Sequence, residues 1–303
     1  MTSMTIRELD PERDADGVVE LLREALPHGV FSRESWLHRV RTIPERAQQA
    51  GWVAEAGGKV VGNSWAFRTF FSEGSTSAQC SVNVRASHRK RGIGSELYEL
   101  MFAHVGALGA TSALASFSEN DAAVAFATGR GFREERAEAE TVLDPRTVDE
   151  RPAPDVDLRA VADIDPRLAY EADIAATRDM PSTETIDEIP YDEWVGHVLE
   201  YPFFTAEGSY VALVDGVGAA VSLLIADEES GRGANMFTGT QRAYRGRGLG
   251  LAVKLASVAW AKEHGITQIA TRNDETNAPM LAINRRLGYR PTRRRVEYLK
   301  QLS

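Results

Sequence analysis

Apolar residues in the first half of the chain recur with the periods of helices and strands. The spacing of Val18, Leu21 and Ala25 predicts a helix over 16–25. A Gly-Gly pair at 57–58 between two apolar runs is typical of a hairpin. The expected strands are 5–9, 52–55, 60–66, 78–84, 112–117 and one that starts at Phe132, and the further helices are 33–40, 97–108 and 121–128.

The second half repeats this order of elements. Strands are expected at 210–214, 219–226, 235–240 and 268–271, and helices at 253–260 and 278–287. In both halves several strands come first, and strands then alternate with helices. This order predicts an α/β fold with a mixed sheet, an α/β sandwich, and not a regular doubly wound sheet.

Two motifs recur at nearly one offset, which indicates a duplication. Gly92 and Gly248 of two similar glycine-rich segments are 156 positions apart, and Asn120 and Asn277 are 157 apart. Prolines near residues 145 and 152–154 interrupt any periodic pattern between the copies. The predicted domains are therefore 1–145 and 155–303, with a linker at 146–154.

Length and composition fit two ordinary globular domains. The chain has 303 residues, of which 43% are hydrophobic and 26% charged. Its net charge of -9 argues against nucleic acid as the main partner, because phosphate binding depends on an excess of Lys and Arg. No apolar run is long enough to cross a bilayer, so no membrane partner is expected.

Cysteine and histidine usage indicates a reducing compartment and no metal. Cys80 is the only cysteine, and the first residues are too polar for a secretory signal, so a cytoplasmic protein is expected. The six histidines show no metal-ligand spacing. A lone thiol in a strand is usually a small buried hydrophobe, and Cys80 is interpreted in that way.

Each glycine-rich segment links a strand to a helix and suits a pyrophosphate. The pattern Arg-x-x-Gly-x-Gly leaves backbone N–H groups free at the positive end of a helix, and glycine permits close approach of a phosphate. A tight turn without a ligand is the alternative for one such loop alone. The chain matches neither the Rossmann pattern with its acidic residue nor the Walker loop.

These residues resemble the GNAT N-acetyltransferase superfamily. The signature Gln/Arg-x-x-Gly-x-Gly/Ala is matched by Arg89, Gly92 and Gly94 and again by Arg245, Gly248 and Gly250. The resemblance covers nearly the whole chain as two tandem acyl-CoA N-acyltransferase folds, the arrangement of mycothiol synthase-like enzymes. It implies an acyltransferase that transfers groups other than amino-acyl groups.

The resemblance also implies the cofactor and the chemistry. Acetyl-CoA would lie in a splay between the fourth and fifth strands of a copy, and the amine of a small molecule would attack it directly, in a monomer or homodimer. A non-catalytic acyl-CoA sensor or scaffold is the alternative. The residues assigned to the cofactor are Val82, Asn83, Val84, Arg89, Lys90, Arg91, Gly92, Ile93, Gly94, Ser95, Asn120, Thr238, Gly239, Thr240, Arg245, Gly246, Arg247, Gly248, Leu249, Gly250, Leu251, Asn273, Asn277 and Asn284.

The chain departs from the family at the tyrosine that protonates the leaving thiolate, seven residues after the motif asparagine. Ala127 and Asn284 stand there, and only Asn284 offers a hydrogen bond. We therefore expect catalysis in the C-terminal half, with Asn284, Tyr289 and Thr240 as the catalytic residues. Core packing is the alternative for Tyr289.

Two further features of the second half have open interpretations. Asn273 and Asn277 bracket the start of a helix, so they are candidates for helix capping as well as for cofactor contact. An acidic run could hold the amine cation of the acceptor or could be a solvated loop. Its members are Asp179, Glu184, Asp187, Glu188, Asp192 and Glu193.

Overall fold

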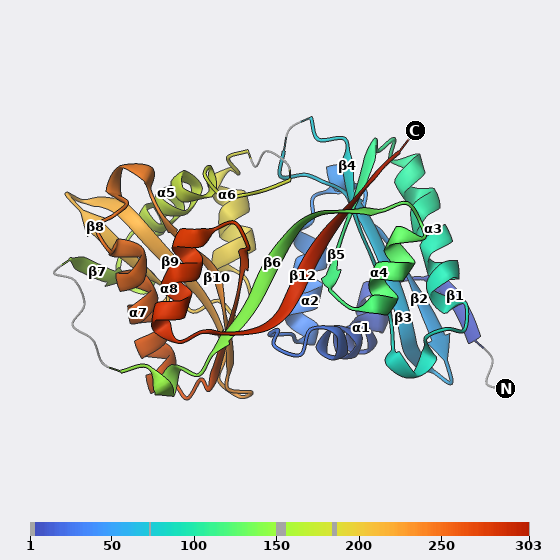
Figure 1. The fold of residues 1–303 in the computed structure, drawn as a ribbon, viewed down its shortest axis with the longest axis horizontal. Helices are drawn as coiled ribbons and strands as arrows, with labels where there is room; N and C mark the ends of the chain where they lie inside the picture. Colours follow the sequence, from blue (N-terminus) through green and yellow to red (C-terminus); the bar gives the residue numbers. More distant parts are fainter. Residues whose placement is uncertain (1–3, 73, 150–155, 184–186, 303) are drawn as a thin grey trace. The chain divides into compact units, whose positions relative to one another are not determined.

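The chain forms two compact units, which the computed structural model describes over residues 4–72, 74–149, 156–183 and 187–302 (Figure 1). The first unit comprises Met1–Pro27, Phe31–Ala137 and Arg294–Ser303. The second comprises His28–Val30 and Glu138–Arg293. Contacts therefore group the chain differently from a single cut near residue 150. The predicted domain boundaries stay a prediction, and residues 150–154 of the predicted linker lie outside the described residues.

Helix α1 (Pro11–Ala25) starts where it does because Asp10 accepts a hydrogen bond from Arg13 N and Pro11 suits the first helical position.

The strands of the first unit's sheet lie in the order β1-β2-β3-β4-β5-β12. The strands of this sheet are β1 (Met4–Glu8), β2 (Ala50–Ala56), β3 (Lys59–Arg68), β4 (Ser77–Val84), β5 (Ser112–Ser118) and β12 (Arg290–Gln301). The helices are α1 (Pro11–Ala25), α2 (Arg33–Thr42), α3 (Ile93–Ala107) and α4 (Asp121–Thr128), with short turns at Glu45–Ala47 and Ala86–His88.

The sheet of the second unit has the order β6-β11-β10-β9-β8-β7. Its strands are β6 (Arg133–Leu143), β7 (Asp157–Ala160), β8 (Tyr210–Val214), β9 (Val217–Asp227), β10 (Arg232–Thr240) and β11 (Gln268–Asp274). Its helices are α5 (Pro166–Thr177), α6 (Tyr191–Trp194), a π-helical turn (Val195–Leu199), α7 (Leu249–Glu263) and α8 (Ala278–Leu287), with short turns at Pro145–Thr147, Val161–Asp163 and Arg242–Tyr244. The strands β7 and β12 and the helices α5 and α6 were not among the elements predicted from the sequence.

The last strand of each sequence repeat completes the sheet of the other unit. In the first unit β12 pairs antiparallel with β5, from Arg295↔Ser118 to Gln301↔Ser112. In the second unit β6 pairs antiparallel with β11, from Asp274↔Glu138 to Ile269↔Leu143. Each sheet therefore needs a strand from both halves of the sequence.

A parallel pair of strands separates in each sheet. The β4–β5 pairs run from Ser77↔Ser112 to Cys80↔Ala115, although β4 continues to Val84. The β10–β11 pairs stop at Ala234↔Ala270, although β10 continues to Thr240. The inner edges of β4 and β10 beyond these points are left with backbone groups that the neighbouring strand does not pair.

Helices cover both faces of the second sheet because successive strand residues point to opposite sides. Val221 of β9 packs with Ala172 and Trp194 on the side of α5. The neighbouring Ala220 packs with Leu249 and Val253 of α7. Figure 1 shows α7 and α8 beside each other on one face of these strands. In the first unit, α1 and α2 share a core with β2 and β3, and α3 packs over β4.

Across the described ranges, no helix combines the length and the apolar character that a bilayer span requires.

The exchanged strand β12 should carry a large share of the first unit's stability. Tyr298 is 3% exposed and stacks on Phe117 with ring centroids 5.0 Å apart. We expect Tyr298→Ala to lower the free energy of unfolding by about 3–5 kcal/mol, the cost of emptying a buried aromatic site. Urea denaturation measures this change. The matched control is Arg290→Ala at the exposed start of the same strand, which should change it by about 0.5 kcal/mol or less. Equal effects of the two variants would contradict this role of β12.

Candidate functional site

The two glycine loops open α3 and α7 with uncapped helix ends. Gly92 and Gly248 precede these helices with φ of 87° and 79°, a left-handed conformation that favours glycine. Neither helix has a side chain that caps its first turn. The first backbone N–H groups of each helix are thus available to an anion.

The signature arginines hold the loops against the preceding strands. Arg89 Nε donates to the carbonyl oxygen of Val84 at 3.0 Å, and Arg245 Nε donates to that of Thr240 at 3.1 Å. Both units therefore fix the loop to the end of the splayed strand in the same way. These arginines therefore have a positioning role.

The other predicted loop residues divide into exposed groups and buried anchors. Lys90 and Gly246 occupy equivalent positions with positive φ of 59° and 78°. Arg91 donates to the carbonyl of Ser87, and Arg247 lies over the ring of Tyr244. Ile93 and Leu249 are buried and anchor their helices, so only their backbone can face a ligand. Ser95 Oγ accepts from Arg130, and Leu251 is half-buried.

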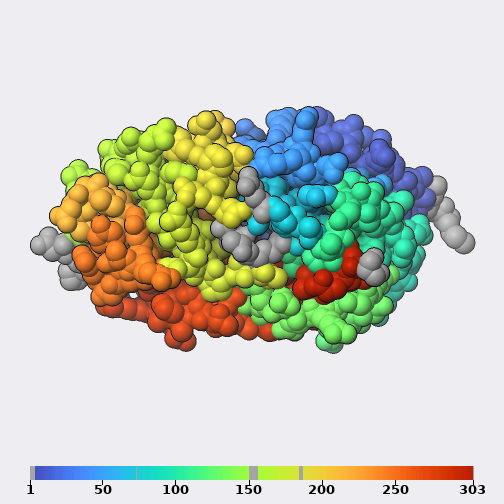
Figure 2. Space-filling model, turned by 90° about the horizontal axis from the view of Figure 1, so that it is seen from above, coloured from blue at the N-terminus to red at the C-terminus, as the bar shows by residue number. Residues whose placement is uncertain are grey.

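The surface of the second loop is open, and a carboxylate stands at its edge. Residues 245–248 are exposed, and the orange segment that holds them lies on the visible face in Figure 2 beside the lime-green segment of α5. Asp179 accepts from Arg245 at 2.7 Å and also pairs with Arg242. These arginines hold the pKa of Asp179 below its usual range.

The strand ahead of the second loop carries a β-bulge. The register of β10 against β9 shifts between Asn235 and Phe237, and then continues from Thr238↔Ser222 to Thr240↔Ala220. In the first unit β4 pairs with β3 in continuous register from Arg68↔Ala78 to Gly62↔Val84. A bulge re-aims the backbone groups that follow it. The predicted residues Thr238, Gly239 and Thr240 therefore have a different backbone setting from Val82, Asn83 and Val84.

The predicted asparagines have distinct partners. Asn120 caps α4, since its Oδ1 accepts from Ala123 N at 3.0 Å and its Nδ2 donates to the Ser118 carbonyl. Asn277 caps α8 by accepting from Met280 N at 3.2 Å. Asn273, on β11 beyond the last β10–β11 pair, accepts from Asn284 Nδ2 at 2.6 Å. Capping is thus the present role of Asn120 and Asn277, and Asn273 belongs to another network.

That network is centred on a buried lysine of α7. Lys254 Nζ donates to Asn284 Oδ1 at 2.6 Å and lies 4.7 Å from the centroid of the Tyr289 ring. Lys254 and Asn284 are 1% and 2% exposed. Burial lowers the pKa of Lys254 to about 7 and raises that of Tyr289 above its ordinary value, so Tyr289 stays protonated. Tyr289 Oη has no hydrogen-bond partner among the described residues.

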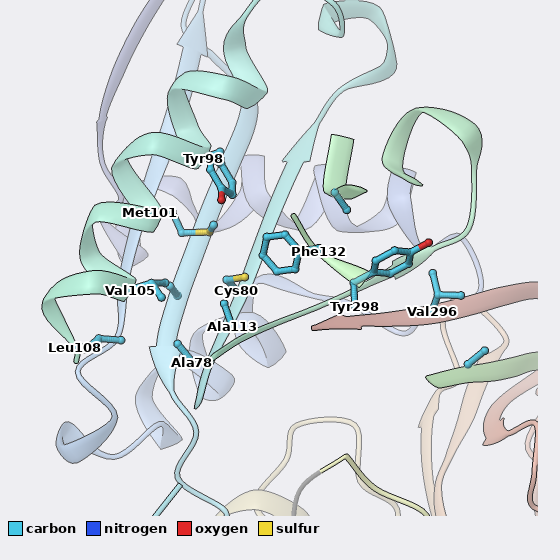
Figure 3. Packing of buried hydrophobic residues seen from close by; sticks show 13 residues of the cluster. Ala78, Cys80, Tyr98, Met101, Val105, Leu108, Ala113, Phe132, Val296 and Tyr298 are labelled. Carbon is cyan, nitrogen blue, oxygen red and sulfur yellow. The ribbon is translucent and has the colours of Figure 1, made fainter. Parts of the chain in front are cut away.

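Aromatic side chains occupy the equivalent place in the first unit. Tyr98, at the position of Lys254, stacks on Phe102 and meets Phe126 edge-on. Arg130 lies 3.6 Å from the centroid of the Phe126 ring and donates to Ser95 at the start of α3. Figure 3 shows Tyr98 and Met101 of α3 pointing toward Cys80 and Phe132. Burial raises the pKa of the Cys80 thiol to about 12, which keeps it protonated, as its interpretation as a buried hydrophobe requires.

The acidic run of the second unit has the arrangement of an ion-paired surface. Asp179 pairs with loop arginines, and Glu188 pairs with Arg178 at 2.6 Å. Glu184 lies outside the described residues. A different carboxylate, Asp173, is buried in α5 and accepts from Trp194 Nε1 at 2.7 Å, and burial raises its pKa to about 6.

Lys254 and Asp173 were not among the residues predicted from the sequence. The signal for Lys254 is its position: it follows Gly250 by four residues and precedes Val258 by four, on the buried face of an otherwise apolar helix. The described residues contain no group of three His, Cys, Asp or Glu side chains that could hold a metal ion.

Two sheets with splayed parallel strands, each followed by a glycine loop that opens a helix, define a duplicated acyltransferase fold. The chain belongs to the acetyltransferase (GNAT) family, whose model matches it at residues 15–132 and again at 172–289. The predicted family, the mixed α/β fold and the two tandem domains of this family are confirmed. The family is one of N-acetyltransferases, and its members generally use acetyl-CoA.

Individual relatives agree with this assignment. The mycothiol acetyltransferase of Parafrankia sp. (strain EAN1pec) is 27% identical over 263 residues, which cover 78% of this chain and 79% of that protein. A GCN5-related N-acetyltransferase from Sphaerobacter thermophilus has a similar fold, with a TM-score of 0.73, 19% identity, and coverage of 98% and 95% of the two chains. A tandem GNAT protein from the clavulanic acid biosynthesis pathway also has a similar fold, with a TM-score of 0.72 and 20% identity. The match covers 99% of this chain and 98% of that one.

The buried lysine should make stability depend on pH. Because the pKa of Lys254 falls from 10.5 to about 7 on folding, the unfolded chain binds more protons than the folded chain between these values. The burial penalty is therefore present at low pH and is relieved as pH rises through this window. The Lys254→Met variant lacks this penalty. The difference in free energy of unfolding, variant minus natural chain, should therefore be larger near pH 7 than near pH 10 by about 3–4 kcal/mol.

Urea denaturation at the two pH values measures this difference. The control is Lys262→Met, which replaces an exposed lysine of the same helix and should show the same relative stability at both. A pH-independent effect of Lys254→Met would contradict a lowered pKa for this group.

Proposed function

We propose that this chain transfers an acetyl group from acetyl-CoA to the amine of a small molecule by direct attack, with the chemistry in the C-terminal half. Acetyl-CoA supplies the acyl group as a reactive thioester. The observation that carries the proposal is the second unit's combination of a splayed β10–β11 pair, a bulged β10 and an uncapped α7. We further propose a cytoplasmic monomer or homodimer.

The cofactor-binding part of the proposal rests on unpaired backbone groups. Beyond Ala234, the edge of β10 that faces β11 offers N–H and C=O groups in the spacing of a strand. An extended amide chain such as pantetheine suits that edge. The N–H groups at the start of α7, with the cationic side chains of Arg245 and Arg247, suit the pyrophosphate.

Two differences favour the second unit as the catalytic one. The bulge is on β10, whereas β4 keeps its register. Lys254 and Asn284 form a buried polar pair between α7 and α8, whereas Phe126 and Arg130 contact each other at the equivalent place beside α3. Thr240 follows the bulge, and its backbone N–H is our candidate for polarising the thioester carbonyl, since a donor aimed at developing negative charge lowers a barrier.

The proposed catalytic residues have different settings. Asn284 engages both polar atoms of its amide, with Lys254 and Asn273, so we assign it a positioning role toward the leaving thiolate. Tyr289 is buried and faces Lys254, which supports the packing alternative. We keep proton donation by Tyr289 as a test outcome.

The second candidate function is a non-catalytic acyl-CoA sensor. The observation that favours it is the lack of a phenol at positions 127 and 284. Release of free thiol from acetyl-CoA across a panel of amines separates the two functions, because a sensor binds the thioester without consuming it.

Replacement of Gly250 should abolish coenzyme A binding in the second unit. A Cβ at this position would lie 3.0 Å from Thr240 Oγ1 and 3.6 Å from Ile283, so the branched side chain of Gly250→Val fills the space between the loop and the splayed strand. Titration calorimetry should show one fewer binding site, or affinity reduced by about a hundredfold or more. Unchanged stoichiometry and affinity in the folded variant would count against the loop as the binding site.

The same substitution in each half tests which half is catalytic. We expect Gly250→Val to remove thiol release and Gly94→Val, its counterpart in the first unit, to retain it within about threefold, because the first unit lacks the bulge and the Lys254–Asn284 pair. The opposite pattern would assign catalysis to the N-terminal half.

A further inference from the structure

Lys254 is a buried lysine without a counter-ion. Its side chain is 1% exposed, and its ammonium has one hydrogen-bond acceptor, Asn284 Oδ1, at 2.6 Å. No carboxylate of the described residues forms an ion pair with it. Burying an ammonium in this way costs several kcal/mol, so such groups are candidates for a function.

The lysine lies on the side of α7 that faces the proposed site. Lys254 follows Gly250 by one helical turn, and the Gly250 position faces Thr240 and Ile283. Asn284 follows Ile283 in α8, and its Nδ2 donates to Asn273 on the part of β11 that has separated from β10. Two hydrogen bonds thus connect Lys254 to the opening between the strands.

The groups around Lys254 leave its charge uncompensated. Burial alone lowers its pKa, with no contribution from a neighbouring charge. Tyr289, the residue before β12, faces Lys254 with its ring, and Ser257 on the next turn of α7 donates to Ser222 of β9. Asp274 at the end of β11 accepts from Thr276 N, and Arg285 and Arg286 of α8 are exposed.

We propose that Lys254 supplies the positive charge and the proton that the departing thiolate needs in the second unit, and that Asn284 positions its amino group. The inference rests on the proposed function. In the transfer, the acceptor nitrogen bonds to the carbonyl carbon and the C–S bond breaks with its electron pair on sulfur. Lys254 gives one Nζ proton to the sulfur. The attacking amine loses one proton to solvent, and Lys254 regains one proton from solvent. The flexible four-carbon chain of lysine permits the short movement required.

The structure of the second unit also allows a purely structural role, in which Lys254 only braces Asn284. That role predicts a change in cofactor affinity when Lys254 is replaced, with no change in the ionisation of the bound thiol. A proton source predicts instead a change in the ionisation of the bound thiol and in the turnover number. The two are therefore separable by measurements on the whole chain.

The test follows the ultraviolet absorbance of the coenzyme A thiolate, bound to the full chain, as a function of pH. In the natural protein the bound thiol should ionise at a pH lower by about one unit or more than in Lys254→Met, a tenfold stabilisation of the thiolate. Lys254→Met keeps the length and apolar volume of the side chain, and thermal unfolding checks its fold. Tyr98→Phe changes the equivalent position of the first unit and should leave the ionisation unchanged.

A second variant and a kinetic readout cover the case in which Lys254→Met does not fold. Asn284→Ala frees the lysine, and should lower kcat by about tenfold to a hundredfold while KM for acetyl-CoA changes by less than about threefold. Tyr289→Phe removes only the phenol and so tests the alternative proton donor. Loss of turnover in Tyr289→Phe with full turnover in Asn284→Ala would overturn the proposal in favour of Tyr289.

The outcomes distinguish this inference from the function it rests on. If the natural protein does not bind coenzyme A, the proposed function fails. If it binds coenzyme A and the thiol ionises at the same pH in the natural protein and in Lys254→Met, the role of Lys254 is overturned and the proposed function stands.

Discussion

The separation of β10 from β11 is the constraint on which the second unit's site depends. The two strands pair only as far as Ala234↔Ala270, and β10 then continues for six residues without that neighbour. Unpaired strand edges are costly unless water or a ligand satisfies them. The bulge at Asn235–Phe237, the Arg245 bond to the Thr240 carbonyl and the glycine loop all act on this same stretch. This edge of β10 is therefore where the proposal places the extended amide chain of the cofactor.

Duplication produced two such openings whose contents differ. The first unit keeps the loop, the arginine bond and the separated strands, but aromatic rings and Arg130 pack beside α3. The second unit has Lys254 and Asn284 there. A buried aromatic cluster stabilises by removing apolar surface from water, whereas a buried lysine costs stability. The first unit is thus arranged for packing, and the second retains a costly charge beside the splayed strands.

Much of this organisation was predictable from the sequence. The glycine loops, the order of strands and helices and the duplication follow from local patterns, and the helices 121–128 and 278–287 lie where they were expected. Helix α8 starts at its predicted asparagine because that side chain caps it. The strand exchange was not predictable, because the sequence of Arg290–Gln301 would suit a strand in either unit. Only its pairing with β5 in the folded chain places it in the first unit. The role of Lys254 also depends on burial, which its sequence neighbours suggest but tertiary packing determines.

Amide hydrogen exchange with and without coenzyme A tests the central claim most directly, since it reports on the backbone groups in question. The account predicts slower exchange, on binding, at residues 235–240 and 249–251, with little change at Tyr98 and its neighbours on α3. Protection confined to residues 82–95, or no protection at either loop, would contradict the second unit as the site of the cofactor.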